Sequence, residues 1–275
     1  MKKTYIALFL IFNFSILAFA QQTRGILANE ENIIEDLKLN VCEDEQRLEA
    51  VKNLFKKMGA SDDSIKIEKF KNVENLVVTK KGKTEETIIV GAHYDKTKKG
   101  CGVIDNWTGI VIIANLYRTL KQYSTDKTFV FVAFGKEEIG LVGSNAMAKE
   151  IPKEKRVNYC SMINFDSFGF NYPQILENTS SPKITKTAKA VAEEMNLKLT
   201  AASLEGLADA DSSSFLDKDI PAVTFHGLSD DWQKYLHSSN DKPENVNPRS
   251  VLIGYLYGFK FLVNIDKSDC GVFRK

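Results

Sequence analysis

Four continuous apolar runs dominate the hydrophobic pattern of the chain. They lie at 87–92, 128–134, 161–165 and 221–226. Such runs are typical of strands that are buried on both faces of a sheet. Two shorter segments before them, IKIEKF and NLVVTK, alternate between apolar and polar residues and predict strands with one solvated face.

Helical periodicity separates these runs. The spacing of apolar residues predicts helices at about 43–58, 107–122, 141–150, 182–195 and 248–264. Ser181-Pro182 and Asn247-Pro248 each place a capping residue before a proline, a pair typical of helix starts. Buried strands that alternate with helices predict an α/β fold, with a mixed, mostly parallel sheet and helices on both faces.

The first twenty residues are predicted to be a secretory signal peptide. Lys2 and Lys3 precede an apolar stretch, and Ala18-Phe19-Ala20 forms a small-x-small cleavage site. The alternative is a membrane anchor, but the stretch is shorter than the ~20 apolar residues that a span needs. No repeat or linker divides the remainder, so 21–275 is expected to form a single domain that is secreted or periplasmic.

The charge balance gives no indication of a polyanionic partner. The chain has 37 Lys and Arg against 36 Asp and Glu. Removal of Lys2 and Lys3 with the signal leaves a net charge of about −1. We therefore expect no nucleic acid as partner, and no membrane association of the mature form.

Four cysteines would enter an oxidising compartment with the mature chain. They lack Cys-x-x-Cys spacing, which disfavours a zinc-thiolate site. Three complete pairings are possible, and we predict a Cys42–Cys270 bond that ties the two ends together. Cys160 stands in an apolar run and is interpreted as a small buried hydrophobe.

Acids and histidines follow the apolar runs where the strands are predicted to end. Ligands bind outside the carboxyl ends of strands in such sheets. A single acid there is usually a helix cap or a solvated loop residue, but the coincidence recurs at every central strand. The residues concerned are His93, Asp95, Glu137, Glu138, Asp166 and His237, and Asp105 lies in the loop after the first run.

These side chains predict a metal centre. Imidazole nitrogens and carboxylate oxygens are ligands suited to zinc. Three carboxylates packed together without cations would have strongly raised pKa values. Two divalent ions balance Asp105, Glu138, Asp166 and a hydroxide, and leave Glu137 free to act as a base.

The motifs GAHYD…GVIDNWTG, FGKEEIGLVGS, NFDSFG and LHSSNDKPENV resemble the zinc-dependent aminopeptidases with a two-zinc centre. That family is related to carboxypeptidases, glutaminyl cyclases and the transferrin-receptor ectodomain, and the resemblance covers about 43–265.

The resemblance implies a role for each residue of the set. His93 and Asp166 would bind one zinc, Glu138 and His237 the other, and Asp105 would bridge both. Glu137 would be the general base, Asp95 would orient His93, and the Asp105-Asn106 peptide would be cis. The implied reaction is hydrolysis of the N-terminal peptide bond of peptides with a free N-terminus. The short chain, in which no lid or dimerisation insertion is evident, favours a monomer.

Some positions depart from the family pattern. Lys136 would depress the pKa of Glu137 unless its side chain points away. Trp107 either lines the pocket or packs at a helix start. Leu236 stands where some members carry an aromatic residue, so no additional hydroxyl donor to the oxyanion is expected.

Two further positions fall outside the expected ligand set. The segment with Asp209 and Asp211 is either a solvated turn or part of the substrate pocket. His226 is interpreted as a structural or pocket-wall histidine.

Three alternative functions stay open. A glutaminyl-cyclase-like acyltransferase with one zinc would use the same fold, although EEIGLVGSNAMAK lacks the longer tryptophan-containing segment typical of cyclases. A non-catalytic binding ectodomain would be expected to have lost the ligands. A carboxypeptidase or dipeptidase would bind the substrate differently, and the sequence does not fix which end is bound.

Overall fold

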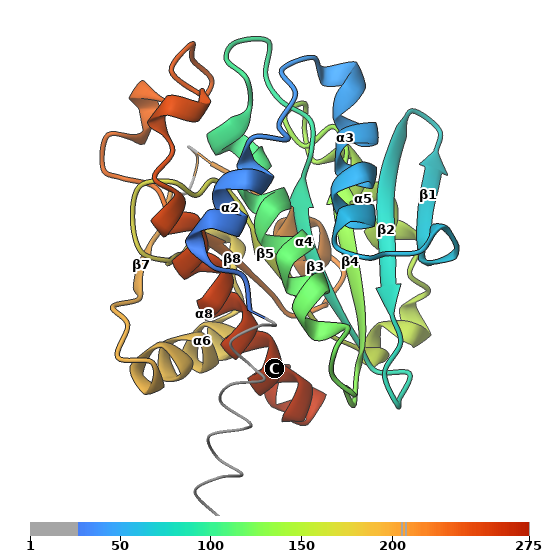
Figure 1. Cartoon of the computed structure of the whole chain (residues 1–275). Coiled ribbons are helices and arrows are strands. Elements are labelled where there is room, and N and C mark those ends of the chain that lie inside the picture. Colours follow the sequence, from blue (N-terminus) through green and yellow to red (C-terminus); the bar gives the residue numbers. More distant parts are fainter. Residues whose placement is uncertain (1–26, 205, 207, 275) are drawn as a thin grey trace, which may run out of the picture.

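The computed structural model describes residues 27–204, 206 and 208–274. Its strands form one sheet in the order β1-β2-β4-β3-β5-β8-β6-β7 (Figure 1). The strands are β1 (Ile65–Phe70), β2 (Val73–Lys80), β3 (Thr87–His93), β4 (Thr128–Phe134), β5 (Tyr159–Phe165), β6 (Gln174–Leu176), β7 (Thr200–Ala202) and β8 (Ala222–His226). The α-helices are α2 (Glu30–Leu37), α3 (Asp44–Lys57), α4 (Thr108–Leu120), α5 (Val142–Glu150), α6 (Pro182–Glu194), α7 (Asp211–Leu216) and α8 (Pro248–Lys267).

The centre of the sheet is a parallel block. β4, β3, β5 and β8 run in the same direction, whereas β2 pairs antiparallel with β4 and β6 pairs antiparallel with β8. The register aligns the ends of the strands, since His93 pairs with Phe134 and Phe165 pairs with Phe225. The residues that follow these four strands therefore meet at one edge.

Helices cover both faces, which explains the continuous apolar runs. On β3, Ile88 and Val90 pack into the larger core with α2, α3, α4, α6 and α8. Ile89 between them packs into the smaller core, to which Ala148 of α5 and Phe215 of α7 contribute. In Figure 1, α2, α4 and α8 lie in front of the sheet and α5 lies behind it. The predicted fold class is confirmed.

The six strands and five helices expected from the pattern are all present, with ends shifted by a few residues. The short elements α2, α7, β6 and β7 were not predicted. α2 has only three apolar residues and depends on a capping box in which Asn29 and Asn32 bond each other's backbone. α7 reads DSSSFL, a composition that resembles a loop.

The predicted Cys42–Cys270 bond is wrong. Cys42 bonds Cys101 and Cys160 bonds Cys270. Cys42 precedes α3, which packs beside the loop that carries Cys101, so their Cα atoms lie 4.3 Å apart. Cys160 is buried as expected, but it is half of a disulfide rather than a free apolar side chain.

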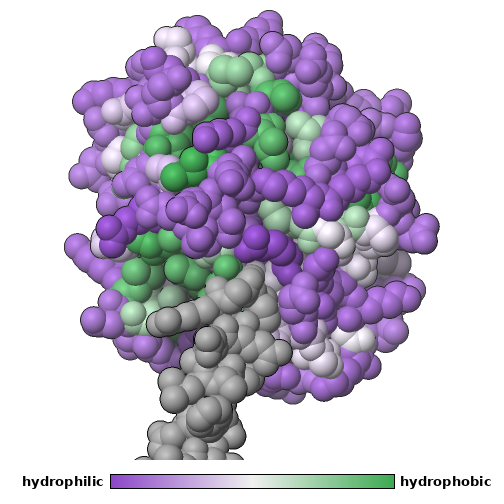
Figure 2. Space-filling view, in the orientation of Figure 1, coloured by the Kyte–Doolittle hydropathy of each residue, from purple (hydrophilic) through white to green (hydrophobic). Residues whose placement is uncertain are grey.

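The region of the predicted signal peptide lies outside the described residues. None of the helices within residues 27–204, 206 and 208–274 has the length and apolarity that a membrane span requires. The face that carries α4 and α8 is largely hydrophilic, with apolar side chains in separate patches (Figure 2).

Candidate metal centre and substrate cavity

The carboxyl edge of the parallel block brings together two groups of possible metal ligands. His93, Asp105 and Asp166 form the first, and Asp105, Glu138 and His237 form the second. Within each group, one ligand atom from each residue lies within 4.8 Å of the others. The five residues predicted as ligands thus form two adjoining sites that share Asp105.

In the first group, His93 and Asp105 are buried and Asp166 is partly buried. His93 Nε2 lies 3.0 Å from Asp105 Oδ1 and 3.6 Å from Asp166 Oδ1. His93 ends β3 and Asp166 directly follows β5, its neighbour in the sheet. Ser167 Oγ donates a hydrogen bond of 3.1 Å to Asp166 Oδ1, which fixes the orientation of that carboxylate.

The second group opens toward solvent. His237 Nε2 lies 3.2 Å from Asp105 Oδ2 and 3.1 Å from Glu138 Oε2. The side chain of His237 is 58% exposed, whereas those of Asp105 and Glu138 are 7% exposed. Asp105 therefore presents one oxygen to each histidine.

The donor set fits divalent cations. Glu138 Oε1 is buried without a hydrogen-bond partner, as a carboxylate oxygen aimed at a cation would be. Without a metal ion, hydrogen bonds to Asp105 and Glu138 raise the pKa of His237 to about 10. Burial opposes the ionisation of Asp105, but hydrogen bonds from His237 and His93 outweigh it and lower the pKa of Asp105. The site thus attracts positive charge to the position that a cation would fill.

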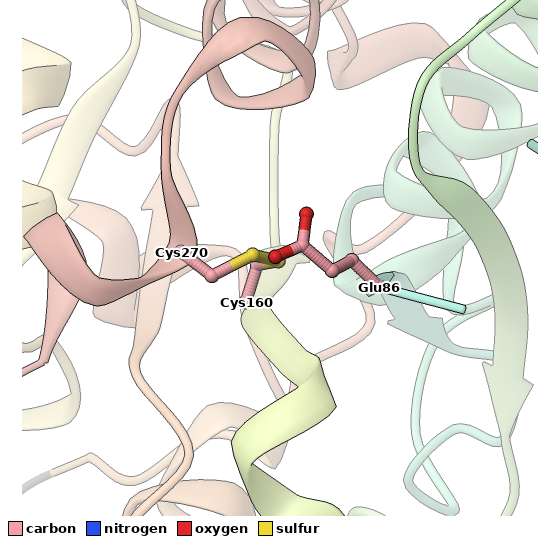
Figure 3. A group of neighbouring side chains, drawn as sticks. All are labelled: Glu86, Cys160 and Cys270. Carbon is pink, nitrogen blue, oxygen red and sulfur yellow. A yellow bond between two sulfur atoms is a disulfide. The ribbon is translucent and has the colours of Figure 1, made fainter. Parts of the chain in front are cut away.

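A third group of possible ligands lies at the opposite end of the sheet. Glu86 stands beside Cys160 and Cys270 (Figure 3). The two sulfur atoms are bonded to each other, and Glu86 lies 3.3 Å from the ammonium group of Lys127. This group is therefore a disulfide next to an ion pair.

Asp95, which follows β3, connects the end of β3 to the turn after β4. Its Oδ1 accepts from the Glu137 N–H at 2.9 Å, and its Oδ2 accepts from the Glu138 N–H at 3.2 Å. His93 Nδ1 lies 3.2 Å from the main-chain oxygen of Asp95 and 3.6 Å from its carboxylate. Asp95 thus holds the turn with the two glutamates as well as the imidazole.

Glu137 lies in this turn between β4 and α5, beside the first ligand group. Burial raises the pKa of Glu137, while the charge of His93 acts in the opposite direction. Lys136 does not depress it, because its ammonium group points away and donates to the carbonyl of Asn72. A carboxyl group of raised pKa at this place suits proton transfer near neutral pH.

The backbone around the site is unusual. Lys136, Leu141 and His237 have φ values of 59°, 57° and 56°, in the left-handed region. Non-glycine residues rarely adopt this conformation, which is enriched at functional sites. The Asp105-Asn106 peptide is cis, as the resemblance implied.

Asn106 joins the loop of Asp105 to the end of β5. Its Nδ2 donates to the Phe165 carbonyl at 3.0 Å, and its Oδ1 accepts from the Ser167 N–H at 3.0 Å. The same oxygen accepts from the Gly109 N–H at 3.0 Å. A Cβ at Gly109 would collide with Asn106 and with the Phe165 carbonyl, so this close approach requires glycine.

Asp241 is a positioning residue that the sequence interpretation missed. It is 2% exposed, and its carboxylate accepts from the backbone N–H groups of Val103, Ile104 and Asp105 at 2.8, 2.7 and 3.3 Å. It lies four residues after His237 and so links the loops of two predicted ligands. Its presence in the quoted motif LHSSNDKPENV was the available signal.

Arg47 was also missed, because it lies in a helix that reads as amphipathic. It is fully buried and donates to the carbonyls of Tyr94, Val41, Cys101 and Gly102. Trp107 lies 5.6 Å beneath its guanidinium. Trp107 is fully buried and therefore packs at the helix start rather than lining the cavity.

A cavity of about 1310 Å³ opens at the two ligand groups. Glu177, Asp209 and Asp217 line it in addition to the predicted ligands and Glu137. Among the described lining residues, none is lysine or arginine. The cavity therefore favours a positively charged group over a negatively charged one.

The remaining residues considered in the sequence, Asp209, Asp211 and His226, occupy different positions relative to this cavity. Asp209 is exposed and lines it, whereas Asp211 is fully buried at the start of α7, so a solvated turn is wrong for Asp211. Burial raises the pKa of Asp211 to about 7. His226 lies in the cavity wall, one of the two places expected for it.

Comparison with known proteins assigns the chain to a family. Residues 75–253 match Peptidase family M28, so the chain belongs to this family. Aminopeptidase YwaD of Bacillus subtilis is 25% identical over 198 residues, which are 67% of this chain and 43% of that protein. A probable leucine aminopeptidase of Arthroderma otae is 26% identical over 74% of this chain and 60% of its own length. The chain spans only part of the length of these relatives.

Solved structures share the fold. LapA aminopeptidase of Legionella pneumophila superposes with a TM-score of 0.76 at 21% identity, over 89% of this chain and 73% of its own. A glutaminyl cyclase of an Acidobacteriales bacterium superposes with a TM-score of 0.74 at 14% identity, over 88% of this chain and 96% of its own. At these identities the likeness shows the fold alone.

Proposed function

We propose that this chain is a two-zinc aminopeptidase that hydrolyses the N-terminal peptide bond of peptides. The observation that carries this proposal is the pair of ligand groups joined by Asp105, with the half-buried Glu137 beside them in the same cavity. His93 and Asp166 would hold one ion and Glu138 and His237 the other. The bound ions would activate water and polarise the scissile carbonyl.

In this proposal, Glu137 is the general base. It takes a proton from the attacking water and passes the proton to the leaving amine. Asp95 fixes the main chain of Glu137, which gives the base a defined position. The raised pKa of Glu137 supports both halves of this transfer.

The charge of the cavity supports recognition of an N-terminus rather than a C-terminus. Acidic residues in the wall attract the ammonium group of a free N-terminus. A carboxypeptidase or dipeptidase needs a cation for the substrate carboxylate, and no described lining residue is lysine or arginine. Peptides with a free N-terminus are therefore the proposed substrates.

We also propose that the protein is a secreted or periplasmic monomer, with residues 1–20 removed as a signal peptide. Both disulfides support an oxidising compartment. Mass spectrometry of the exported protein tests the cleavage site, with Gln21 expected at the new N-terminus.

The experiment that tests the function combines metal analysis with an assay on aminoacyl-nitroanilides. We expect about two zinc ions per chain, and activity that is lost to a chelator and in Glu137→Gln. Glu137→Asp serves as a matched variant, since it retains a carboxyl group at a shorter reach. Two bound zinc ions and full activity in Glu137→Gln would contradict the role of Glu137.

A glutaminyl-cyclase-like activity is the second candidate. The shared fold is compatible with it, since the superposition covers 96% of the cyclase chain, but the site itself offers no observation that favours it over the peptidase. One zinc per chain, with cyclisation of an N-terminal glutaminyl peptide and no release of nitroaniline, would establish it. A purified protein without any metal would favour a binding ectodomain.

A further inference from the structure

His226 stands beside the first ligand group without a role so far. It is the last residue of β8, whose neighbour β5 leads into Asp166. The Asp166 N–H donates to the Phe225 carbonyl at 2.9 Å, and the Gly227 N–H donates to the Ser167 carbonyl at 2.9 Å. These bonds flank His226, so its backbone is fixed next to that of Asp166.

The alternation along β8 directs His226 away from the main core. The ring of Phe225 packs against Phe165 at 5.8 Å between centroids, on the side of α8. Thr224 and His226 therefore face the other side, and both line the substrate cavity. His226 is 9% exposed, so it belongs to the wall rather than to the rim.

Hydrogen bonding determines which ring nitrogen carries the proton. His226 Nδ1 accepts from the Leu228 N–H at 3.4 Å. The neutral ring then carries its proton on Nε2. Nε2 is buried without a hydrogen-bond partner among the described residues. Burial lowers the pKa of His226 to about 4, in keeping with a neutral ring.

A buried donor of this kind is usually paired. We propose that the Nε2–H of His226 donates a hydrogen bond to a main-chain carbonyl oxygen of the peptide bound in the cavity. This inference rests on the proposed function and adds a substrate contact to it. A tightly held water is the alternative partner, and the test below separates the two.

The chemistry of the cavity favours a carbonyl as the acceptor. Glu177, Asp209 and Asp217 in the wall can accept from the ammonium and N–H groups of a peptide, but they cannot donate to its oxygens when ionised. His226 supplies a donor that is neutral and therefore adds no repulsion toward the substrate ammonium. The position next to Asp166 makes the scissile carbonyl the first candidate and the following carbonyl the second.

Kinetics of two variants distinguish the scissile carbonyl from the following carbonyl as the acceptor. His226→Phe keeps a ring of similar size without a donor, and His226→Gln retains an N–H. If the acceptor is the scissile carbonyl, His226→Phe should lower kcat about 100-fold or more with little change in KM. If the acceptor is the following carbonyl, KM should rise while kcat is kept. In both cases His226→Gln should recover part of the loss.

Both variants are compared at equal zinc content and after thermal unfolding has shown an intact fold. A His226→Phe enzyme with kcat and KM within twofold of the wild type would overturn the proposal. Equal losses in His226→Phe and His226→Gln would also overturn it, because they would show a packing role.

Nuclear magnetic resonance provides a readout that does not require hydrolysis. The chain has three histidines, so ¹⁵N-histidine labelling gives a simple spectrum. In Glu137→Gln loaded with zinc, the peptide Lys-Ala-Ala should move the Nε2–H signal of His226 downfield and slow its exchange with water. A signal that does not respond to bound peptide would assign water as the partner and overturn the proposal.

The two proposals fail separately. A wild-type enzyme that releases no nitroaniline contradicts the aminopeptidase, whereas the spectrum still shows whether His226 contacts a bound peptide. A protonated ring, or a proton on Nδ1, would contradict the contact even in an active enzyme.

Discussion

Replacement of Asp241 by asparagine should weaken metal binding without unfolding the protein. Asp241 Oδ1 accepts from Val103 and Ile104, and its Oδ2 accepts from Asp105. Asparagine can keep the two contacts of Oδ1. Its amide group would then face the Asp105 N–H, so that two donors meet, and the negative charge behind the bridging position would be lost.

The structure sets the size of the effect. Removal of a residue that orients a metal ligand typically costs 10- to 100-fold in metal affinity, which corresponds to about 1.4–2.7 kcal/mol. Burial, and then the charge of Asp105, raise the pKa of Asp241 to about 6. Without zinc, the variant therefore loses hydrogen bonds but also loses a repulsion, and its free energy of unfolding should change by only about 1 kcal/mol.

The assay is zinc competition against a chromophoric chelator at pH 7.5, with thermal unfolding measured in zinc and in chelator. The control is Asp63→Asn, which removes the same charge from an exposed turn. Because Asp241 becomes protonated below pH 6, the wild-type advantage in zinc affinity should shrink as the pH falls through this value. A variant that binds zinc within twofold of the wild type at pH 7.5 would refute the reasoning.

Three further perturbations test other parts of the structure. Arg47→Met leaves several buried carbonyls without a donor and should lower the free energy of unfolding by about 3–5 kcal/mol, which corresponds to a fall of roughly 6–20 °C in Tm. The control Lys56→Met, on the same helix, should cost less than about 1 kcal/mol. Equal Tm values for the two variants would contradict the role of Arg47. Because the cavity wall is acidic, lysyl-nitroanilide should be cleaved faster than glutamyl-nitroanilide. Glu177→Gln should reduce the ratio of the lysyl to the glutamyl kcat/KM by up to about fivefold. An unchanged ratio would exclude a contribution of Glu177 to this preference. The pKa of Asp211 is about 7 in the folded protein and about 3.9 in an unfolded chain. The protonated side chain is the form that suits the buried position, so the stability it contributes is complete below about pH 3.9 and is lost as the pH rises to about 7. In chelator, Asp211→Asn should therefore gain stability over the wild type between pH 4 and pH 7, by about 4 kcal/mol at most; a constant difference in Tm across this range would contradict the burial of an ionisable group.

The parts of the fold that could be predicted are those in which local pattern and burial agree. The runs of β3, β4, β5 and β8 are apolar on both sides because helices cover both faces of the sheet. The elements that were missed depend on tertiary contacts. α2 is held by Trp107, whose Nε1 donates to the Asp36 carbonyl at 3.1 Å, and by Asn115, which donates to the Asp36 carboxylate at 2.9 Å.

The disulfides show the same limit. Four cysteines allow three pairings, and the choice depends on distances between segments that are far apart in the sequence. Arg47 bonds the carbonyls of both Val41 and Cys101, so it brings the residue before Cys42 next to Cys101. A buried cation that organises carbonyls gives no signal in an amphipathic helix pattern.

Three of the predicted ligands, His93, Glu138 and Asp166, could be proposed from the sequence because they end or closely follow strands whose ends meet at one edge in a parallel sheet. Asp105 and His237 lie in loops, and their predicted roles depended on the family resemblance. The residues that set their orientation could not be found in this way. Asp241, Asn106 and Arg47 act through backbone groups, and any acid, amide or base elsewhere in the sequence would be equally compatible with such a role. Asp95 belongs to both classes, since it directly follows a strand and its carboxylate bonds the backbone of Glu137.

The hydrogen bonds made by Asp95 and Asp241 also explain how one edge of the sheet can carry so many carboxylates. Asp95 and Asp241 each accept from at least two backbone N–H groups, and each of those groups belongs to a loop with a predicted ligand or with Glu137. The negative charge that would attract the metal ions is thus also the charge that orders the loops. If this coupling holds, zinc binding and loop order should change together: in the Asp241→Asn variant, amide exchange of Val103 and Ile104 should speed up, and added zinc should slow it less than in the wild type. Unchanged exchange at these two amides, combined with weaker zinc binding, would show that Asp241 acts through its charge alone.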